Sequence, residues 1–266
     1  MNKILVPVDF SETSLNAVYY AVQLFQPEPY EITVLHVFSS NPTMMALKNI
    51  DRMVLEDTRR SLDKLMAKVH QKFPDANLKS KILKDYAVSA IASLGDSGDY
   101  DFIVMGTKGA SGLQEVFLGS VAGGVISKTR APVIVVPDGH SFQPLEEIVI
   151  ALSESPESGK KVEDPLRKIA AMHHSNIKAL HIEDTKPHEM EKALADITDL
   201  RPTVDYTFGS GNTHKDMNDY LIENESEMLC MIRGKKGFFS RLFKESATLK
   251  ETFDSPVPLL ILHDAI

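Results

Sequence analysis

The sequence predicts an α/β protein made of two tandem five-stranded parallel sheets with helices on both faces, and three observations lead to this prediction. Short β-branched runs alternate with longer segments of helical periodicity, which is typical of parallel sheets. After a polar connection at residues 139–144 the same alternation starts again. The length of 266 residues suits two domains of ordinary size. We therefore expect one domain at residues 1–140 and a second at 145–266.

The first half opens with the continuous apolar run Ile4–Val8, which is typical of a strand buried on both faces. Asp9 follows this run directly and would stand at the carboxyl end of the strand. The run Leu78–Leu83 is more polar and suits the edge of a sheet. Further strands are expected at residues 32–38, 102–105 and 133–136, and helices before Pro27, from Asn41 to about Pro74, at 87–94 and from Ser120 onward.

The second half repeats this plan with different residues. The segment Glu147–Leu152 matches the first strand of the chain, and helical spacing follows through Leu166 and Met172. Strands are expected next at residues 177–182, 203–208, 228–232 and 258–262, and helices at 190–200 and 217–222. The closing segments of the two halves superpose at a fixed offset of 126 residues, as Ser120 and Ser246 show.

Residues 101–137 have the pattern of a strand, a glycine-rich loop, a helix and a second strand. The loop contains Gly106 and Gly109, and Gly119 and Ser120 precede the helical segment. Glycines let the main chain come close to a ligand, and the helix N-terminus adds unpaired N–H groups and the positive end of a dipole. The pattern predicts a cradle for a phosphate group. The same glycines would also suit a tight turn and close packing of the helix on the strand.

Asp9 and Gly106 each follow a predicted strand of the first half. In parallel α/β sheets, ligands bind outside the carboxyl ends of the strands, at the point where the strand order reverses. If the strands that end at these two residues are neighbours, the Asp9 carboxylate and the glycine loop face one crevice. An N-cap role for Asp9 in the following helix is the alternative that its position alone leaves open.

The composition argues against some classes of function. There are 29 Lys and Arg residues against 37 Asp and Glu residues, and the net charge of −8 argues against general binding to nucleic acids or anionic membranes. No stretch approaches the roughly 20 apolar residues of a membrane span, so a cytoplasmic location is expected. The single cysteine, Cys230, lies in an apolar run and is expected to be a buried, unreactive thiol.

Gly106-Thr107-Lys108-Gly109, nine further residues and Gly119-Ser120 form the pattern G-x2-G-x9-G-[S/T]. This pattern resembles the nucleotide motif of the universal stress protein family. The opening Val6-Pro7-Val8-Asp9 and residues 131–137 resemble the first and last strands of that family. The resemblance covers the first half and implies a Rossmann-like fold of the adenine nucleotide alpha hydrolase type. In the ATP-binding branch of the family it also implies bound ATP, with or without Mg²⁺.

The resemblance assigns roles to individual residues of this chain. It implies that Asp9 binds the ribose, that Val37 lines the adenine and that Met105 flanks the nucleotide. It implies contacts to phosphates and ribose from Gly106, Gly109, Gly119, Ser120 and Val121. Pro7, Val8 and Thr107 complete the expected nucleotide-binding set.

In the second half, different residues stand at the signature positions. When the halves are superposed, Gly106, Gly109 and Gly119 fall on Ile232, Lys235 and Glu245, and Asp9 falls on Ser153. A carboxylate at residue 245 would repel a phosphate. One nucleotide per chain is therefore expected, in the first half, although Gly234 and Gly237 leave a shifted site open. Residues 233–244 are basic with interleaved phenylalanines, which would suit a solvated loop or a site for an anion, RNA or an acidic partner.

Three functions are consistent with these features. The first is a stress-response ATP-binding protein whose C-terminal domain has a structural or regulatory role. The second is a slow ATP hydrolase or phosphotransferase at the same site, and the third is a nucleotide-free interaction scaffold. The sequence contains no P-loop motif and no metal-ligand spacing among its histidines, so no catalytic or metal-binding residue is assigned. By the resemblance, residues 133–136 and 259–262 would pair across the two domains, and a homodimer is left open.

Overall fold

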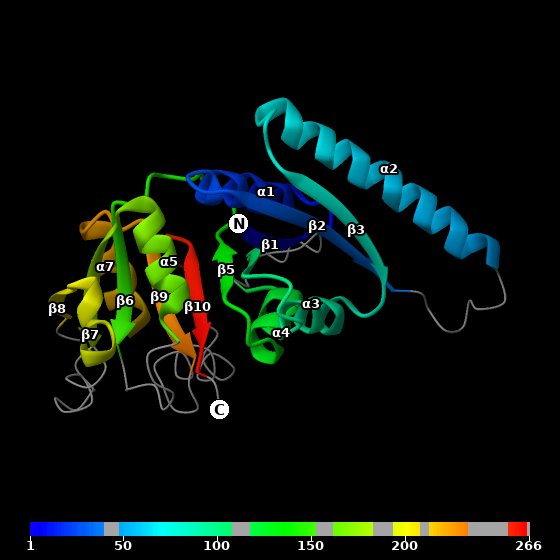
Figure 1. Cartoon of the computed structure of the whole chain (residues 1–266). Coiled ribbons are helices and arrows are strands. Elements are labelled where there is room, and N and C mark those ends of the chain that lie inside the picture. Colours follow the sequence, from blue (N-terminus) through cyan, green and yellow to red (C-terminus); the bar gives the residue numbers. More distant parts are fainter. Residues whose placement is uncertain are drawn as a thin grey trace. The chain divides into compact units, whose positions relative to one another are not determined.

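The structure is a computed structural model of the chain, and it describes residues 1–39, 48–107, 118–152, 162–182, 194–207, 213–233 and 255–264. Strands and helices alternate along it as the sequence predicts (Figure 1). The chain divides into two compact units, Met1–Ala131 and Pro132–Ile266. The division between them falls ahead of the strand at residues 133–136, whereas the expected sequence repeat places that strand in the first domain.

The first unit contains a parallel sheet in which β1 lies between β2 and β4, with β3 beyond β2. Its strands are β1 (Asn2–Pro7), β2 (Tyr30–Phe38), β3 (Leu78–Lys84) and β4 (Phe102–Gly106). The chain therefore leaves β1 toward β2 on one side and returns to β4 on the other. This reversal of strand order confirms that the strands ending near Asp9 and Gly106 are neighbours.

Helices cover both faces of this sheet. Those of the first unit are α1 (Glu12–Phe25), α2 (Lys48–Lys72), α3 (Ala87–Gly95) and α4 (Ser120–Lys128). Helices α1 and α2 lie on one side of the strands, and α3 and α4 lie on the other (Figure 1). This distribution follows from right-handed crossovers, because the path from β1 to β3 runs in the opposite direction to the path from β3 to β4.

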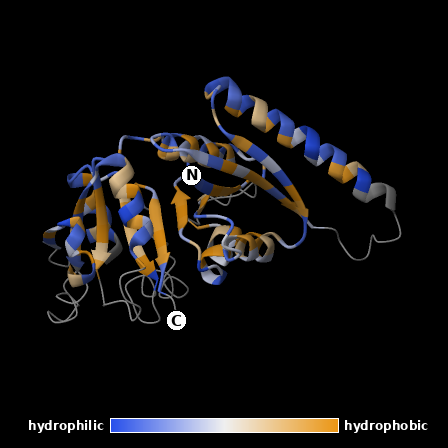
Figure 2. Cartoon of the chain, viewed as in Figure 1, coloured by the Kyte–Doolittle hydropathy of each residue, from blue (hydrophilic) through white to orange (hydrophobic). Residues whose placement is uncertain are grey.

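The core of the first unit is made by the apolar strands and by one face of each helix. Ile4, Leu5 and Val6 of β1 are fully buried, as expected for a central parallel strand. The polar strand β3 pairs with β2 and is only partly covered, which confirms its edge position. Figure 2 shows apolar strands beside a largely hydrophilic α2. Within the described residues, no helix combines the length and apolar character needed to cross a membrane.

The second unit contains the same order of parallel strands, with β6 between β7 and β9. Strand β8 lies beyond β7, and β10 lies beyond β9. The strands are β6 (Glu147–Leu152), β7 (Asn176–Ile182), β8 (Thr203–Thr207), β9 (Met228–Arg233) and β10 (Leu259–His263). Cys230 on β9 is buried and free, and burial raises the pKa of its thiol, as expected for an unreactive cysteine.

Strand β5 (Val133–Val136) also belongs to the second unit and pairs antiparallel with β10. In this register Leu260 lies opposite Ile134 and Leu259 opposite Val135. All four residues of β5 are buried. Residues 133–136 and 259–261 thus pair as predicted, but both strands belong to the second unit, so a pairing across two domains stays a prediction.

The helices of the second unit depart from the sequence prediction at one point. Helices α5 (Asp164–His173) and α7 (Thr213–Glu223) lie where helical spacing is found. The predicted helix at residues 190–200 is only partly confirmed: residues 190–193 lie outside the described part, residues 194–196 are helical, and Thr198–Leu200 forms a 3₁₀ turn. Pro202 explains this end, because a residue before proline disfavours the right-handed helical region, and Arg201 has φ +49°.

Candidate functional site

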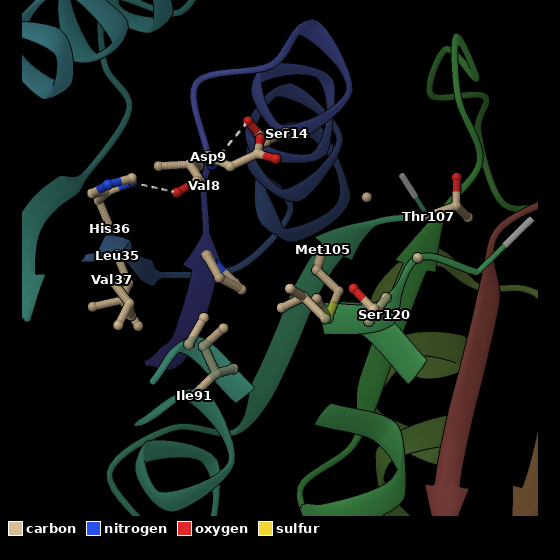
Figure 3. A pocket seen from close by; sticks show the side chains of 16 residues that line it. Val8, Asp9, Ser14, Leu35, His36, Val37, Ile91, Met105, Thr107 and Ser120 are labelled. Atoms are coloured by element: carbon tan, nitrogen blue, oxygen red, sulfur yellow. Dashed lines mark hydrogen bonds between the residues drawn. The ribbon is translucent and has the colours of Figure 1, made fainter. Parts of the chain in front are cut away.

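A cavity of about 320 Å³ opens at the carboxyl ends of β1, β2 and β4 (Figure 3). Helices α3 and α4 complete its wall. This is the place in a parallel α/β sheet where ligands usually bind, and the volume is within the range of small-molecule sites. It is lined by Pro7, Val8, Asp9, Ser14, Leu35, His36, Val37, Ala87, Ile91, Met105, Gly106, Thr107, Gly119, Ser120, Val121 and Ala122.

The cavity brings together ten of the eleven residues that the sequence singles out. They come from segments far apart in the chain, from Pro7 in β1 to Val121 in α4. The eleventh, Gly109, lies outside the described residues. The lining residues that sequence reasoning did not name are Ser14, Leu35, His36, Ala87, Ile91 and Ala122.

The Asp9 carboxylate is held at the start of α1. Its Oδ1 accepts hydrogen bonds from the main-chain N–H of Ser11 at 3.1 Å and from the Ser11 hydroxyl at 2.5 Å. The Asp9 N–H in turn donates to the Ser14 Oγ at 3.4 Å (Figure 3). Ser11 itself is the N-cap of α1 and accepts from the Ser14 N–H. Asp9 therefore lines the cavity and holds Ser11 in place, whereas the N-cap role that its position left open belongs to Ser11.

The N-terminus of α4 has no side-chain cap. Its N-cap residue, Gly119, offers no side chain, and the Gly119 N–H donates to the Thr107 carbonyl oxygen at 2.6 Å. The first N–H groups of an α-helix have no partner within the helix, and they carry the positive end of its dipole. Gly119, Ser120 and Val121 all line the cavity. This end of the cavity is therefore suited to an anion.

Gly106 is required by close packing between β4 and α1. A Cβ atom added at this position would lie 2.7 Å from the Thr13 Cγ2 and 3.1 Å from the Thr13 carbonyl oxygen. An alanine here would therefore require Thr13 to shift, including its main-chain carbonyl group. Gly106 therefore serves close packing against a helix, which was one of the two roles expected for the motif glycines, and it also lines the cavity.

Apolar side chains form a large share of the cavity wall. Leu35, Ile91 and Met105 are buried and line it from β2, α3 and β4. Val121 on α4 is 39% exposed. Ala87 and Ile91 are four residues apart and so share one face of α3, a spacing already visible in the sequence. Such a wall suits a flat apolar group such as a nucleobase.

His36 lies at the end of β2 beside the segment that contains Asp9. Its Nδ1 is 2.8 Å from the Val8 carbonyl oxygen, and its ring stacks on Phe10 with centroids 4.3 Å apart. A carbonyl oxygen can only accept, so Nδ1 carries the proton and donates. Phe10 has φ +65°, in the left-handed region that bulky residues rarely adopt. The sequence gives no signal for this arrangement, because a single histidine at the end of a strand has no distinctive pattern.

Two ionisable side chains, Asp9 and His36, line the described wall of the cavity. Across the described residues, no group of three or more His, Cys, Asp or Glu side chains is placed to hold a metal ion. Among the described residues, the cavity wall therefore offers a ligand main-chain N–H groups, the Asp9 carboxylate, the His36 ring, hydroxyl groups and apolar contacts.

The second unit differs at the corresponding positions. Ile232, which superposes on Gly106, lies within β9. Ser153, Lys235, Glu245 and the basic segment 234–244 lie outside the described residues. A cavity of about 490 Å³ in this unit lies near the amino ends of β6, β9 and β10. Its lining includes His140, Glu146, Glu225, Glu227 and Val257.

Comparisons with known proteins agree with the fold and with the motif. The sequence model of the universal stress protein family matches residues 1–137. One universal stress protein of Methanocaldococcus jannaschii is 32% identical over 139 residues, which are 50% of this chain and 81% of that protein. A second from the same organism is 28% identical over 156 residues, covering 52% of this chain and 96% of that protein.

A solved structure extends the likeness to the whole chain. The crystal structure of a universal stress protein from Archaeoglobus fulgidus covers 99% of this chain and 99% of its own, with a TM-score of 0.70 and 22% identity. At this identity the match shows a shared fold. Because the family match spans about half of the chain and includes the glycine motif and the strand that leads to Asp9, the chain belongs to the universal stress protein family.

Proposed function

We propose that this protein is a stress-response protein that binds ATP, one molecule per chain, in the cavity of the first unit. The second unit would then have a structural or regulatory role. The observation that carries the proposal is the chemistry of the cavity wall, which has three parts. An apolar part from β2, α3 and β4 suits the adenine, the Asp9 carboxylate suits ribose hydroxyls, and the uncapped N-terminus of α4 suits phosphate.

The second half supports the asymmetry of this proposal. Ile232 brings a bulky side chain to the strand end where Gly106 stands in the first half. Glu245 is the counterpart of Gly119 and would bring a negative charge to the phosphate position. A stoichiometry of one ATP per chain is therefore expected, and two would contradict the proposal.

Isothermal titration calorimetry with ATP tests the proposal directly. Wild-type protein should release or absorb heat that saturates at one ATP per chain. Gly119→Glu imports the residue of the second half and places a carboxylate at the N-terminus of α4, so it should abolish binding. No saturable heat with wild type, or unchanged affinity in Gly119→Glu, would rule the proposal out.

Ser80→Glu is the matched control for added charge. Ser80 is exposed on the edge strand β3 and is not among the residues that line the cavity. The variant adds the same charge to the same unit and should bind ATP like wild type. Nucleotide released by denaturing the purified protein, identified by absorbance and chromatography, gives an independent check on the ligand.

A further inference from the structure

Phe10 has an unusual main-chain conformation at a position next to the proposed ribose-binding carboxylate. Its φ of +65° lies in the left-handed region, which is strained for a bulky residue. Phe10 connects Asp9 to Ser11, the N-cap of α1. Strain of this kind persists only where the surrounding contacts hold it in place, and it concentrates at functional sites.

One imidazole contacts the residues on both sides of Asp9. His36 donates from Nδ1 to the carbonyl oxygen of Val8, and its ring stacks on Phe10 at an interplanar angle of 25° (Figure 3 shows the bond to Val8). The Val8 N–H donates to the Leu35 carbonyl oxygen at 2.8 Å, so β2 holds both main-chain groups of Val8. The parallel pairing of β2 with β1 ends at Leu35, which lies opposite Pro7. His36 is the next residue, and the hydrogen bond from its side chain to Val8 links the two chain segments beyond the end of this pairing.

We propose that His36 and Phe10 are positioning residues, which fix the direction in which Asp9 presents its carboxylate to the two hydroxyls of a ribose. This inference rests on the proposed binding of ATP. The bond to Val8 fixes the main chain before Asp9, and the stack on Phe10 fixes it after Asp9. Ser11 then orients Oδ1 of the carboxylate through two hydrogen bonds. The strained backbone of Phe10 is maintained because the turn aims Asp9 into the cavity.

Phe10→Gly separates this role from a purely structural one. Glycine adopts a positive φ without strain, so the variant should unfold at the same or a higher temperature than wild type. It lacks the ring that stacks on His36, so Asp9 is no longer held and the affinity for ATP should fall about tenfold, as for the loss of one hydrogen bond to a charged group. A structural role would make stability and affinity change in the same direction.

Two substitutions of His36 separate its contacts. His36→Phe keeps a ring for stacking on Phe10 but removes the donor to Val8. His36→Asn keeps a short side-chain N–H donor near the position of Nδ1 but removes the ring. Each should weaken ATP binding, and each combined with Asp9→Ala should lower affinity no further than Asp9→Ala alone. Additive losses in these double variants would overturn the inference.

The ligand provides the sharpest readout. Wild type and Phe10→Gly should bind 2′,3′-dideoxy-ATP with equal affinity, because this analogue lacks the hydroxyls that Asp9 would bind. A tenfold loss for ATP with no loss for the analogue supports the inference, whereas equal losses for both ligands overturn it. If wild type binds neither ligand, the proposed function fails. If wild type binds ATP and the variants match it, the positioning role alone fails.

Discussion

The two units contain the same order of parallel strands, yet the cavities formed by their described residues open at opposite ends of the strands. In the first unit the cavity lies at the carboxyl ends of β1, β2 and β4, beside Asp9 and the N-terminus of α4. In the second unit the described cavity lies near the amino ends of β6 and β9, where Glu146 and Glu227 precede the strands. The same strand order thus accompanies different described cavities, so the residues at the strand ends have to be considered one by one.

The segments that join the first strand of each unit to the following helix also differ. Residues 8–11 connect β1 to α1, and Ser11 closes the helix start with a side-chain hydrogen bond. Residues 153–163 connect β6 to α5, and the N-cap of α5 is Glu163, which makes no such bond. In the first unit α1 packs closely on β4, and a Cβ atom added at Gly106 would lie 2.7 Å from the Thr13 Cγ2. The wall of the first cavity near Gly106 therefore depends on this close packing.

The largest expected effect comes from removing this close packing. Gly106→Ala places a Cβ atom 2.7 Å from Thr13 and should destabilise the first unit by about 1–3 kcal/mol. Gly106→Ile, which imports the second unit's residue, should be more destabilising and should also abolish ATP binding. Urea unfolding followed by circular dichroism measures the stability change. Wild-type stability in Gly106→Ala would mean that the contact with Thr13 is easily relaxed.

Gly123→Ala is the matched control for this prediction. Gly123 lies within α4, and an added Cβ would make an ordinary contact at 3.5 Å with the Leu118 side chain. Alanine is a better helix former than glycine, so this variant should gain about 0.5–1 kcal/mol. Replacing glycine by alanine should thus lower the stability at residue 106 and raise it at residue 123.

Much of this architecture follows from sequence patterns because strands and helices have distinct periods. The buried run at Ile4–Val8 predicts β1 to within two residues at its start and one at its end, and Glu147–Leu152 predicts β6 to the residue. The motif glycines also identify one side of the cavity. Their spacing is a property of the chain itself, so it needs no three-dimensional information.

The remainder of the site could not be predicted from these patterns. The His36 contacts with Val8 and Phe10 join segments separated by more than twenty residues, and no periodicity relates them. The left-handed conformation of Phe10 is equally hidden, because the sequence signal for positive φ is glycine or asparagine. The 3₁₀ turn before Arg201 is a different case, because Pro202 is a sequence signal for the end of the helix, whereas helical periodicity alone extends to Leu200.

The next largest expected effect is a gain in stability at a strained residue of the second unit. Glu225 follows α7 with φ +51° and lines the cavity of that unit. Glu225→Gly should stabilise the protein by about 0.5–1 kcal/mol, because glycine adopts this conformation freely at a helix C-terminus. Thermal and urea unfolding both measure this gain. Glu223→Gly is the control: Glu223 lies within α7, so the same substitution two residues earlier should be destabilising.

The smallest expected effect tests the different helix starts of the two units. Glu163, the N-cap of α5, is 1% exposed, and its Oε2 has no hydrogen-bond partner, although Arg167 Nη1 lies 3.8 Å away. Burial raises the pKa of the Glu163 carboxyl above its ordinary value of 4.5. Glu163→Gln should therefore raise the free energy of unfolding at any pH above the raised pKa of Glu163, where the wild-type carboxylate is charged and poorly solvated.

The pH dependence follows from the direction of this shift. Between pH 4.5 and the raised pKa of Glu163, the folded state holds more protons than the unfolded state, so wild-type stability falls as the pH rises through this window. The stability of Glu163→Gln relative to wild type should increase over the same window and stay constant above it. Urea unfolding at a series of pH values measures this difference. Asp164→Asn removes an exposed carboxylate 3.2 Å from the same Arg167 and should change stability by less than about 1 kcal/mol. A loss of stability in Glu163→Gln above the raised pKa would mean that attraction to Arg167 outweighs the burial of the charge.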